Sequence, residues 1–128
     1  MEAVLNRLQA NATVQQRLAA FAANLRAQGY NVTTAIDVRR YDSGVCLETF
    51  VDVERPAPAR SVCWWCEVVP IDGRWRIESY VIQTAQGGQD DLEDFAKIDV
   101  ESSDGVDAAF EAAVGRLLQS ERWNRYVD

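Results

Sequence analysis

The sequence predicts an α+β fold with an N-terminal helix, an antiparallel sheet of four to five meandering strands and a C-terminal helix. Three observations indicate this class. The first thirty residues place apolar side chains at helical spacing, residues 32–81 alternate apolar and polar side chains, and residues 102–118 return to helical spacing. An apolar helix stripe and a half-apolar sheet bury each other, so we expect a two-layer sandwich with the helices on one face. A chain of 128 residues fits a single domain, 1–128, with one core.

The N-terminal helix is interrupted and then terminated by recognisable signals. Thr13-Val14-Gln15-Gln16 has the form of a capping box, so the helix is expected to break or restart near Asn11. Gly29 is expected to end it, because glycine adopts the left-handed conformation that follows a helix. The apolar positions at helical spacing are Leu5, Leu8, Ala12, Leu18, Phe21, Ala22 and Leu25.

Turn signals divide the alternating region into strands and propose their register. Asp72-Gly73 is a strong hairpin signal, and it would pair Ile71 with Arg74, Trp65 with Tyr80, Glu67 with Glu78 and Val68 with Ile77. A Ser43-Gly44 turn would pair Asp42 with Val45, Arg39 with Glu48, Asp37 with Phe50 and Ile36 with Val51. If Arg55 pairs with Arg60 across the proline-containing segment 55–60, Phe50 falls opposite Trp65 and Glu48 opposite Glu67.

The last third of the chain contains a polar segment and a helix. Residues 85–94, AQGGQDDLED, suggest an acidic loop, and residues 95–101 suggest a short fifth strand. A helix is then expected to begin at Ser102 or Ser103, with acids in its first turn. Its apolar face would consist of Val106, Phe110, Ala113, Val114, Leu117 and Leu118.

Composition limits the function. Twenty acidic against thirteen basic residues give a net charge of −7, which disfavours nucleic acid or an anionic membrane as a partner and permits cations or basic proteins. The chain has no histidine, so the commonest general base and most zinc sites are excluded, and we expect no enzyme. No stretch is typical of a signal peptide or a membrane span, so a cytoplasmic location is expected.

The CxxC sequence formed by Cys63 and Cys66 falls inside an alternating segment, SVCWWCEVV. Side chains three apart on a strand point to opposite faces, so the two sulfurs cannot form a disulfide or bind one metal ion without a bulge. Cys66 and Trp64 belong to the core face, with Trp75 on the next strand, whereas Cys63 and Trp65 belong to the other face. We therefore expect two reduced, metal-free thiols.

The non-core face carries two rows of chemical interest. The first is Arg39, Glu48, Glu67 and Glu78, and the second is Asp37, Phe50, Trp65 and Tyr80. Like charges opposite each other on neighbouring strands are destabilising, so the three glutamates require counter-charges. Arg39, Arg74 and Arg76 could provide them, giving a salt-bridged surface, or a cation or basic partner could. An uncovered aromatic row would be an apolar patch typical of an interface. Alternatively, a helix or the tail 121–128 covers this face, or the face forms a homodimer.

The sequence is best interpreted as a non-enzymatic acidic binding protein without a cofactor, with a chaperone-, immunity- or adaptor-like role towards a basic protein or peptide. Its predicted partner-binding residues are Phe50, Trp65, Tyr80, Glu48, Glu67 and Glu78. The alternative is a calcium-binding protein that lacks the EF-hand pattern. The candidate calcium ligands are Asp37, Asp52, Asp90, Asp91, Glu93 and Asp94.

Overall fold

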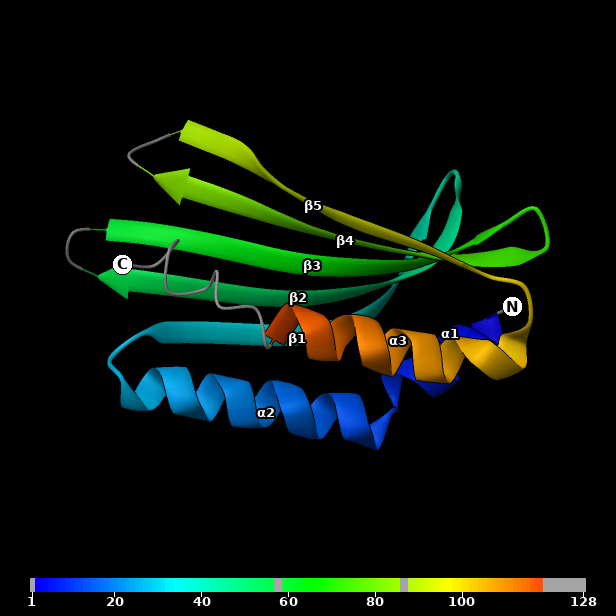
Figure 1. The fold of residues 1–128 in the computed structure, drawn as a ribbon, viewed down its shortest axis with the longest axis horizontal. Coiled ribbons are helices and arrows are strands. Elements are labelled where there is room, and N and C mark those ends of the chain that lie inside the picture. The colour runs from blue at the N-terminus through cyan, green and yellow to red at the C-terminus, as the bar shows by residue number, and fades with distance from the viewer. Residues whose placement is uncertain (1, 57–58, 86–87, 119–128) are drawn as a thin grey trace.

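The computed structural model describes residues 2–56, 59–85 and 88–118, with the side chains of 56, 59–60, 80–85 and 88–98 left out. Within these ranges two helices precede a five-stranded sheet and a third helix follows it (Figure 1). The elements are α1 (Glu2–Gln9), α2 (Ala12–Ala27), β1 (Asn31–Tyr41), β2 (Gly44–Pro56), β3 (Ala59–Ile71), β4 (Arg74–Ala85), β5 (Gly88–Val100) and α3 (Ser103–Leu118). The predicted α+β class is confirmed.

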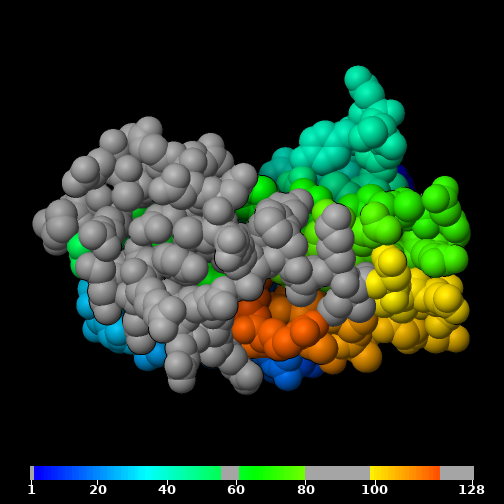
Figure 2. Space-filling view, turned by 45° about the horizontal axis from the view of Figure 1, so that its top comes forward, coloured from blue at the N-terminus to red at the C-terminus, as the bar shows by residue number. Residues whose placement is uncertain are grey.

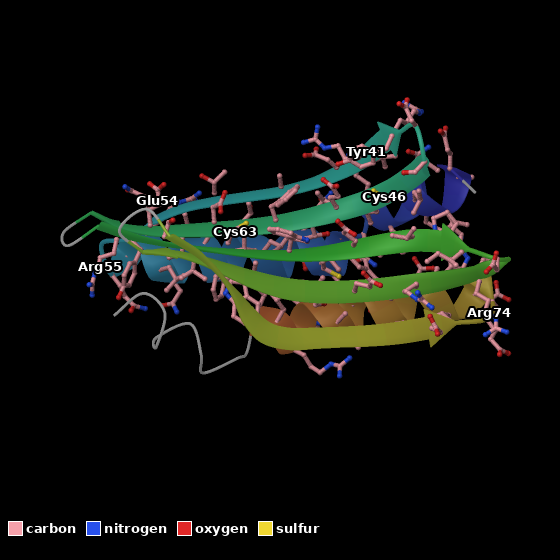
Figure 3. All side chains as sticks on the ribbon, turned by 90° about the horizontal axis from the view of Figure 1, so that it is seen from above. Tyr41, Cys46, Glu54, Arg55, Cys63 and Arg74 are labelled. Carbon is pink, nitrogen blue, oxygen red and sulfur yellow. The ribbon has the colours of Figure 1, made fainter. Side chains whose placement is uncertain are left out.

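The sheet is an antiparallel meander in the order β1-β2-β3-β4-β5, and the three helices pack against one of its faces. Figure 3 looks onto the opposite face, with the helices behind the strands. In the space-filling view the β1–β2 hairpin, coloured cyan to green, projects from the upper side of the molecule (Figure 2). None of the described helices is long and apolar enough to cross a membrane.

The N-terminal helical segment breaks where the sequence indicates. Asn11 is the N-cap of α2, and its side-chain oxygen accepts a hydrogen bond from the backbone N–H of Val14 at 3.0 Å. At the other end of α2, Gly29 has φ +96°, and the N–H of Tyr30 donates to the carbonyl of Leu25 at 3.2 Å. This is the Schellman arrangement, in which glycine tolerates the left-handed conformation that other residues resist.

The core lies between the sheet and the helices. Trp64 on β3 and Trp75 on β4 are 4% and 7% exposed, and Phe110 of α3 is fully buried. The predicted apolar face of α3 is confirmed, since its buried residues are Val106, Phe110, Ala113, Val114 and Leu117. Polar contacts join the helices to each other: Arg7 Nη2 of α1 lies 2.6 Å from Asp107 Oδ2 of α3.

The predicted register of β2, β3 and β4 is confirmed. Ile71 pairs with Arg74 around a turn in which Asp72 has φ 50° and Gly73 has φ 75°. Positive φ at both central residues is the type I′ conformation, which matches the twist of the strands it joins. Glu67 therefore lies opposite Glu78 on β4 and opposite Glu48 on β2.

The predicted register of β1 and β2 is wrong by two residues. The turn residues are Asp42 and Ser43, so Tyr41 pairs with Gly44 and Asp37 pairs with Glu48. Gly44 has φ 140°, which suits the first position of β2 rather than the turn itself. Moving the turn by one residue shifts every partner by two. Because side chains alternate with a period of two, each residue keeps its predicted face.

The acidic loop predicted over residues 85–94 is also wrong, because Ala85 belongs to β4 and residues 88–94 belong to β5. β4 continues to Ala85, and β5 begins at Gly88 and runs to Val100. The pairing shifts between Ser79 and Val81, where β5 contains extra residues. A bulge of this kind lets a polar strand stay paired through its backbone despite an irregular side-chain pattern.

Candidate functional site

The candidate site lies on the face of the sheet that turns away from the helices. Alternate residues of each strand point to it, because successive side chains on a strand leave opposite faces. Tyr41, Cys46 and Cys63 are labelled on this side of the sheet in Figure 3. No described helix packs on this face. The tail 121–128, which the sequence indicates as one segment that could cover this face, lies outside the described residues.

An acidic row crosses four strands of this face. Asp37, Glu48, Glu67 and Glu78 are successive cross-strand partners, and Glu78 is paired in turn with Lys97 of β5. Asp37 occupies the position that the sequence assigned to Arg39, as a result of the two-residue shift. The row therefore contains one more carboxylate than expected.

The counter-charges reach only part of this row. Arg39 lies beside its β1 end, with Nη2 3.4 Å from Asp37 Oδ2 and Nε 3.7 Å from Glu48 Oε2. Arg76, a predicted counter-charge, places Nε 3.0 Å from Asp99 Oδ1, and this hydrogen bond, followed by the nearby charge of Glu78, raises the pKa of Arg76. Glu67 makes no hydrogen bond or ion pair with another described residue.

Glu48 is the buried member of the row. It is 8% exposed, and the phenol of Tyr41 donates a hydrogen bond to its Oε1 at 2.5 Å. The thiol of Cys46 lies 3.9 Å from the same oxygen. Tyr41 reaches this carboxylate because its own cross-strand partner, Gly44, has no side chain. Tyr41 itself is 54% exposed and is the one exposed large hydrophobic side chain among the described residues.

A hollow of about 340 Å³ lies beside the two middle members of the row. Both facing carboxylates, Glu48 and Glu67, line it, together with Tyr41 and Cys46. Val69 and Pro70 add apolar wall. The volume is near the lower end of the roughly 300–1,000 Å³ typical of small-molecule sites, so the hollow can admit one side chain of a partner.

The phenol of Tyr41 and the thiol of Cys46 stay protonated at neutral pH. The hydrogen bond to Glu48 raises the pKa of Tyr41 to about 12. Burial, followed by the charge of Glu48, raises the pKa of Cys46 to about 11. A thiol is a good nucleophile or metal ligand only as the thiolate, so Cys46 is suited to neither role here.

The aromatic row adjoins the acidic row. Phe50 and Trp65 are cross-strand partners with ring centroids 6.2 Å apart and planes inclined at 58°, a tilted packing common for aromatic pairs. Both are half-buried, so the row is less exposed than the sequence suggested. Tyr80 is the β4 partner of Trp65, as predicted, but its side chain lies outside the described residues.

The two cysteines of the CxxC sequence lie on opposite faces, and both are free thiols. Cys66 is 1% exposed in the core, and burial raises its pKa to about 11. Cys63 is half-buried on the open face opposite Asp52, and burial and a hydrogen bond to that carboxylate raise its pKa. The predicted strand geometry therefore holds for this pair.

The candidate calcium ligands do not assemble within the described part of the molecule. Asp37 and Asp52 lie on the same face, but Asp37 is paired with Glu48 and Asp52 with Cys63, in different rows. No group of three or more described His, Cys, Asp or Glu side chains is arranged to hold a metal ion. The side chains of Asp90, Asp91, Glu93 and Asp94 lie outside the described residues.

Sequence reasoning missed Tyr41, Cys46 and the hollow. Tyr41 and Cys46 share the alternation that placed Glu48 on the open face, so their face was predictable. The contact between Tyr41 and Glu48 was not, because Tyr41 pairs with Gly44 and its long side chain extends past its own row to reach Glu48. Comparisons with protein-family models, with curated proteins and with solved structures found no match for this chain.

Proposed function

We propose that this protein is a non-enzymatic acidic binding protein whose open sheet face takes a basic protein or peptide. The observation that carries the proposal is Glu67, a half-buried carboxylate between two others, with no described counter-charge. Like charges directly opposite on neighbouring strands cost stability. A cation supplied by a partner would relieve this repulsion and would interact with the carboxylates of Glu48 and Glu67 at the same time.

The hollow supports an arginine or lysine side chain as the group that enters. Its two carboxylates offer oxygens to a guanidinium or ammonium head, and Glu48 is already held in place by Tyr41. Tyr41, Val69 and Pro70 provide an aromatic and apolar wall for the aliphatic part of such a side chain. A neutral or acidic group would gain little in this hollow.

The neighbouring aromatic pair supports a second anchor. Phe50 and Trp65 lie one row away from Glu48 and Glu67 along the same strands. Aromatic side chains beside charged ones are typical of the residues that contribute most to binding energy. A basic segment with an apolar residue near its arginine or lysine therefore fits this face, as in a chaperone-, immunity- or adaptor-like role.

A binding role rather than a catalytic one is supported by the protonation states. Tyr41 and Cys46 both have raised pKa values, so neither is an activated nucleophile at neutral pH. The chain also has no histidine to act as a general base.

The test is a calorimetric titration of the protein with a short synthetic peptide that alternates arginine and leucine. The titration is carried out at low and at high salt. We expect binding that weakens with salt, and that is lost when glutamine replaces arginine in the peptide. Glu67→Gln should weaken it, whereas Glu101→Gln removes the same charge from an exposed position outside the sheet and should not. Equal weakening by both substitutions would reduce the effect to the net charge and contradict a defined site.

A further inference from the structure

The outer side of β1 is the feature of interest. β1 is an edge strand, with β2 as its one neighbour in the described sheet. In an antiparallel pair, every second residue directs its N–H and C=O away from the partner strand. On an edge strand these groups form a template to which another chain can add.

Two side chains from the helices donate hydrogen bonds to outward-directed carbonyls of β1. Arg26 Nη2, from the last turn of α2, donates to the carbonyl of Val32 at 2.7 Å. Gln9 Nε2, from the end of α1, donates to the carbonyl of Ile36 at 3.1 Å. Val32 and Ile36 are four residues apart, so both belong to the outward-directed set.

The bodies of the helices do not themselves fill the space beside the strand. A hollow of about 320 Å³ lies there, lined by Gln9, Gln15 and Leu18 on the helical side and by residues 34–36 on β1. Gln15 Nε2 donates to the carbonyl of Gln9 at 2.9 Å, which fixes the end of α1 next to α2. Beside residues 34–36 the side chain of Gln9 therefore bonds to the strand backbone at a place where the helices leave a hollow.

We propose that Gln9 and Arg26 close residues 32–36 of the β1 edge to strand addition, so that neither a second copy of this chain nor a partner strand extends the sheet along this stretch. The two blocked carbonyls are roughly 13 Å apart at 3.3 Å per residue, so a strand of ordinary length that adds along residues 32–36 meets both of them. A side chain that donates to such a carbonyl occupies the outward direction from which the N–H of an added strand would approach. This inference is independent of the function proposed for the open face.

The test compares Gln9→Ala/Arg26→Ala with the wild-type chain by sedimentation velocity over a range of concentrations. We expect the double variant to associate, with about a twofold rise in weight-average mass, the value for a symmetric dimer. The matched control is Gln16→Ala/Arg116→Ala, which removes the same two residue types from exposed helix positions. An unchanged mass for the double variant, or an equal rise in the control, would overturn the proposal.

A third substitution identifies the surface that associates. Thr34→Pro in the double variant removes the outward N–H between the two freed carbonyls, and proline is tolerated on an edge strand. The mass should return to the wild-type value, and association that survives Thr34→Pro would overturn the proposal. If circular dichroism shows that the double variant is unfolded, Gln9→Glu/Arg26→Met takes its place. It keeps the size of both side chains but removes both donors, and the same rise in mass is expected.

Discussion

Glu48 and Glu67 lie directly opposite each other on β2 and β3, and both line the hollow beside Tyr41. Their surroundings nevertheless differ. Glu48 accepts a phenol hydrogen bond and has Arg39 nearby, whereas Glu67 has no described hydrogen-bond or ion-pair partner. Because of this difference, the two carboxylates are expected to respond differently to substitution.

Glu67→Gln should leave the free protein as stable as the wild type or more stable, by up to about 1 kcal/mol, since it removes a like-charge contact. Urea denaturation measures the free energy of unfolding, and Glu101→Gln is the control for net charge. A clear loss of stability in Glu67→Gln alone would mean that Glu67 is satisfied internally, and the proposed binding role would lose its main support.

Tyr41→Phe should lower the stability in a pH-dependent way. The pKa of Tyr41 is raised from 10.0 to about 12 in the folded protein, so the contribution of its hydrogen bond is complete below pH 10 and is lost as the pH rises through 12. The difference in unfolding free energy between wild type and Tyr41→Phe should therefore shrink over this range. The thiols titrate in both proteins, so their contribution largely cancels in the difference. A difference that does not change with pH would contradict the bond to Glu48.

Trp64→Ala and Trp65→Ala should separate the core from the open face. Trp64 is buried in the core, so its truncation should cost about 3–5 kcal/mol of unfolding free energy. Trp65→Ala should cost much less and should weaken binding of the arginine-leucine peptide or dimerisation through this face. An equal loss of stability at the two positions would show that the open face is covered.

A thiol probe should modify Cys63 before Cys66 in the native protein. Cys66 is 1% exposed and becomes accessible only when the sheet opens, whereas Cys63 lies half-buried on the open face. Both reactions should be slow at neutral pH because both pKa values are raised. Mass spectrometry of the modified peptides gives the order, and simultaneous modification would contradict the opposite placement.

Calcium titration distinguishes the binding proposal from the alternative. Calorimetry with calcium and with magnesium should show no micromolar binding and no change in circular dichroism if the face is reserved for a basic partner. A micromolar calcium response that changes the conformation would favour the carboxylates of residues 90–94 and replace the first interpretation.

The turn residues show how far the sequence can specify a sheet. Asp72-Gly73 fixes the register of β3 and β4, because glycine is needed at the second position of the turn. The predicted Arg55–Arg60 pair gave the register of β2 and β3. Asp42-Ser43-Gly44 can form a turn at Asp42-Ser43 or at Ser43-Gly44. Glycine is compatible with both, since it can lie within the turn or directly after it. Matching apolar residues across the ladder could not choose between them, because the two registers differ by two residues and preserve every face.

The remaining misses have other physical causes. Residues 88–94 lack an alternating apolar pattern, yet they form an edge strand, because pairing of the backbone requires no particular side chain. The bond between Tyr41 and Glu48 depends on a long side chain that extends past its own row, which pairing rules do not describe. The members of the acidic and aromatic rows on β2, β3 and β4, in contrast, depend on alternation and on the register of these strands, and they could be predicted. The β1 member of each row was wrong, because it depends on the β1–β2 turn.

The meander also has a consequence for the order of folding. Each strand pairs with the next along the chain, so every ladder of the sheet can form by closing a short loop. The helical layer differs, since Arg7 meets Asp107 and Asn11 meets Glu111 across separations of 100 residues. We therefore expect the hairpins to form early and the docking of α3 against α1 and α2 to be a late step. During synthesis on the ribosome, α1 and α2 would leave the exit tunnel first but complete their packing last.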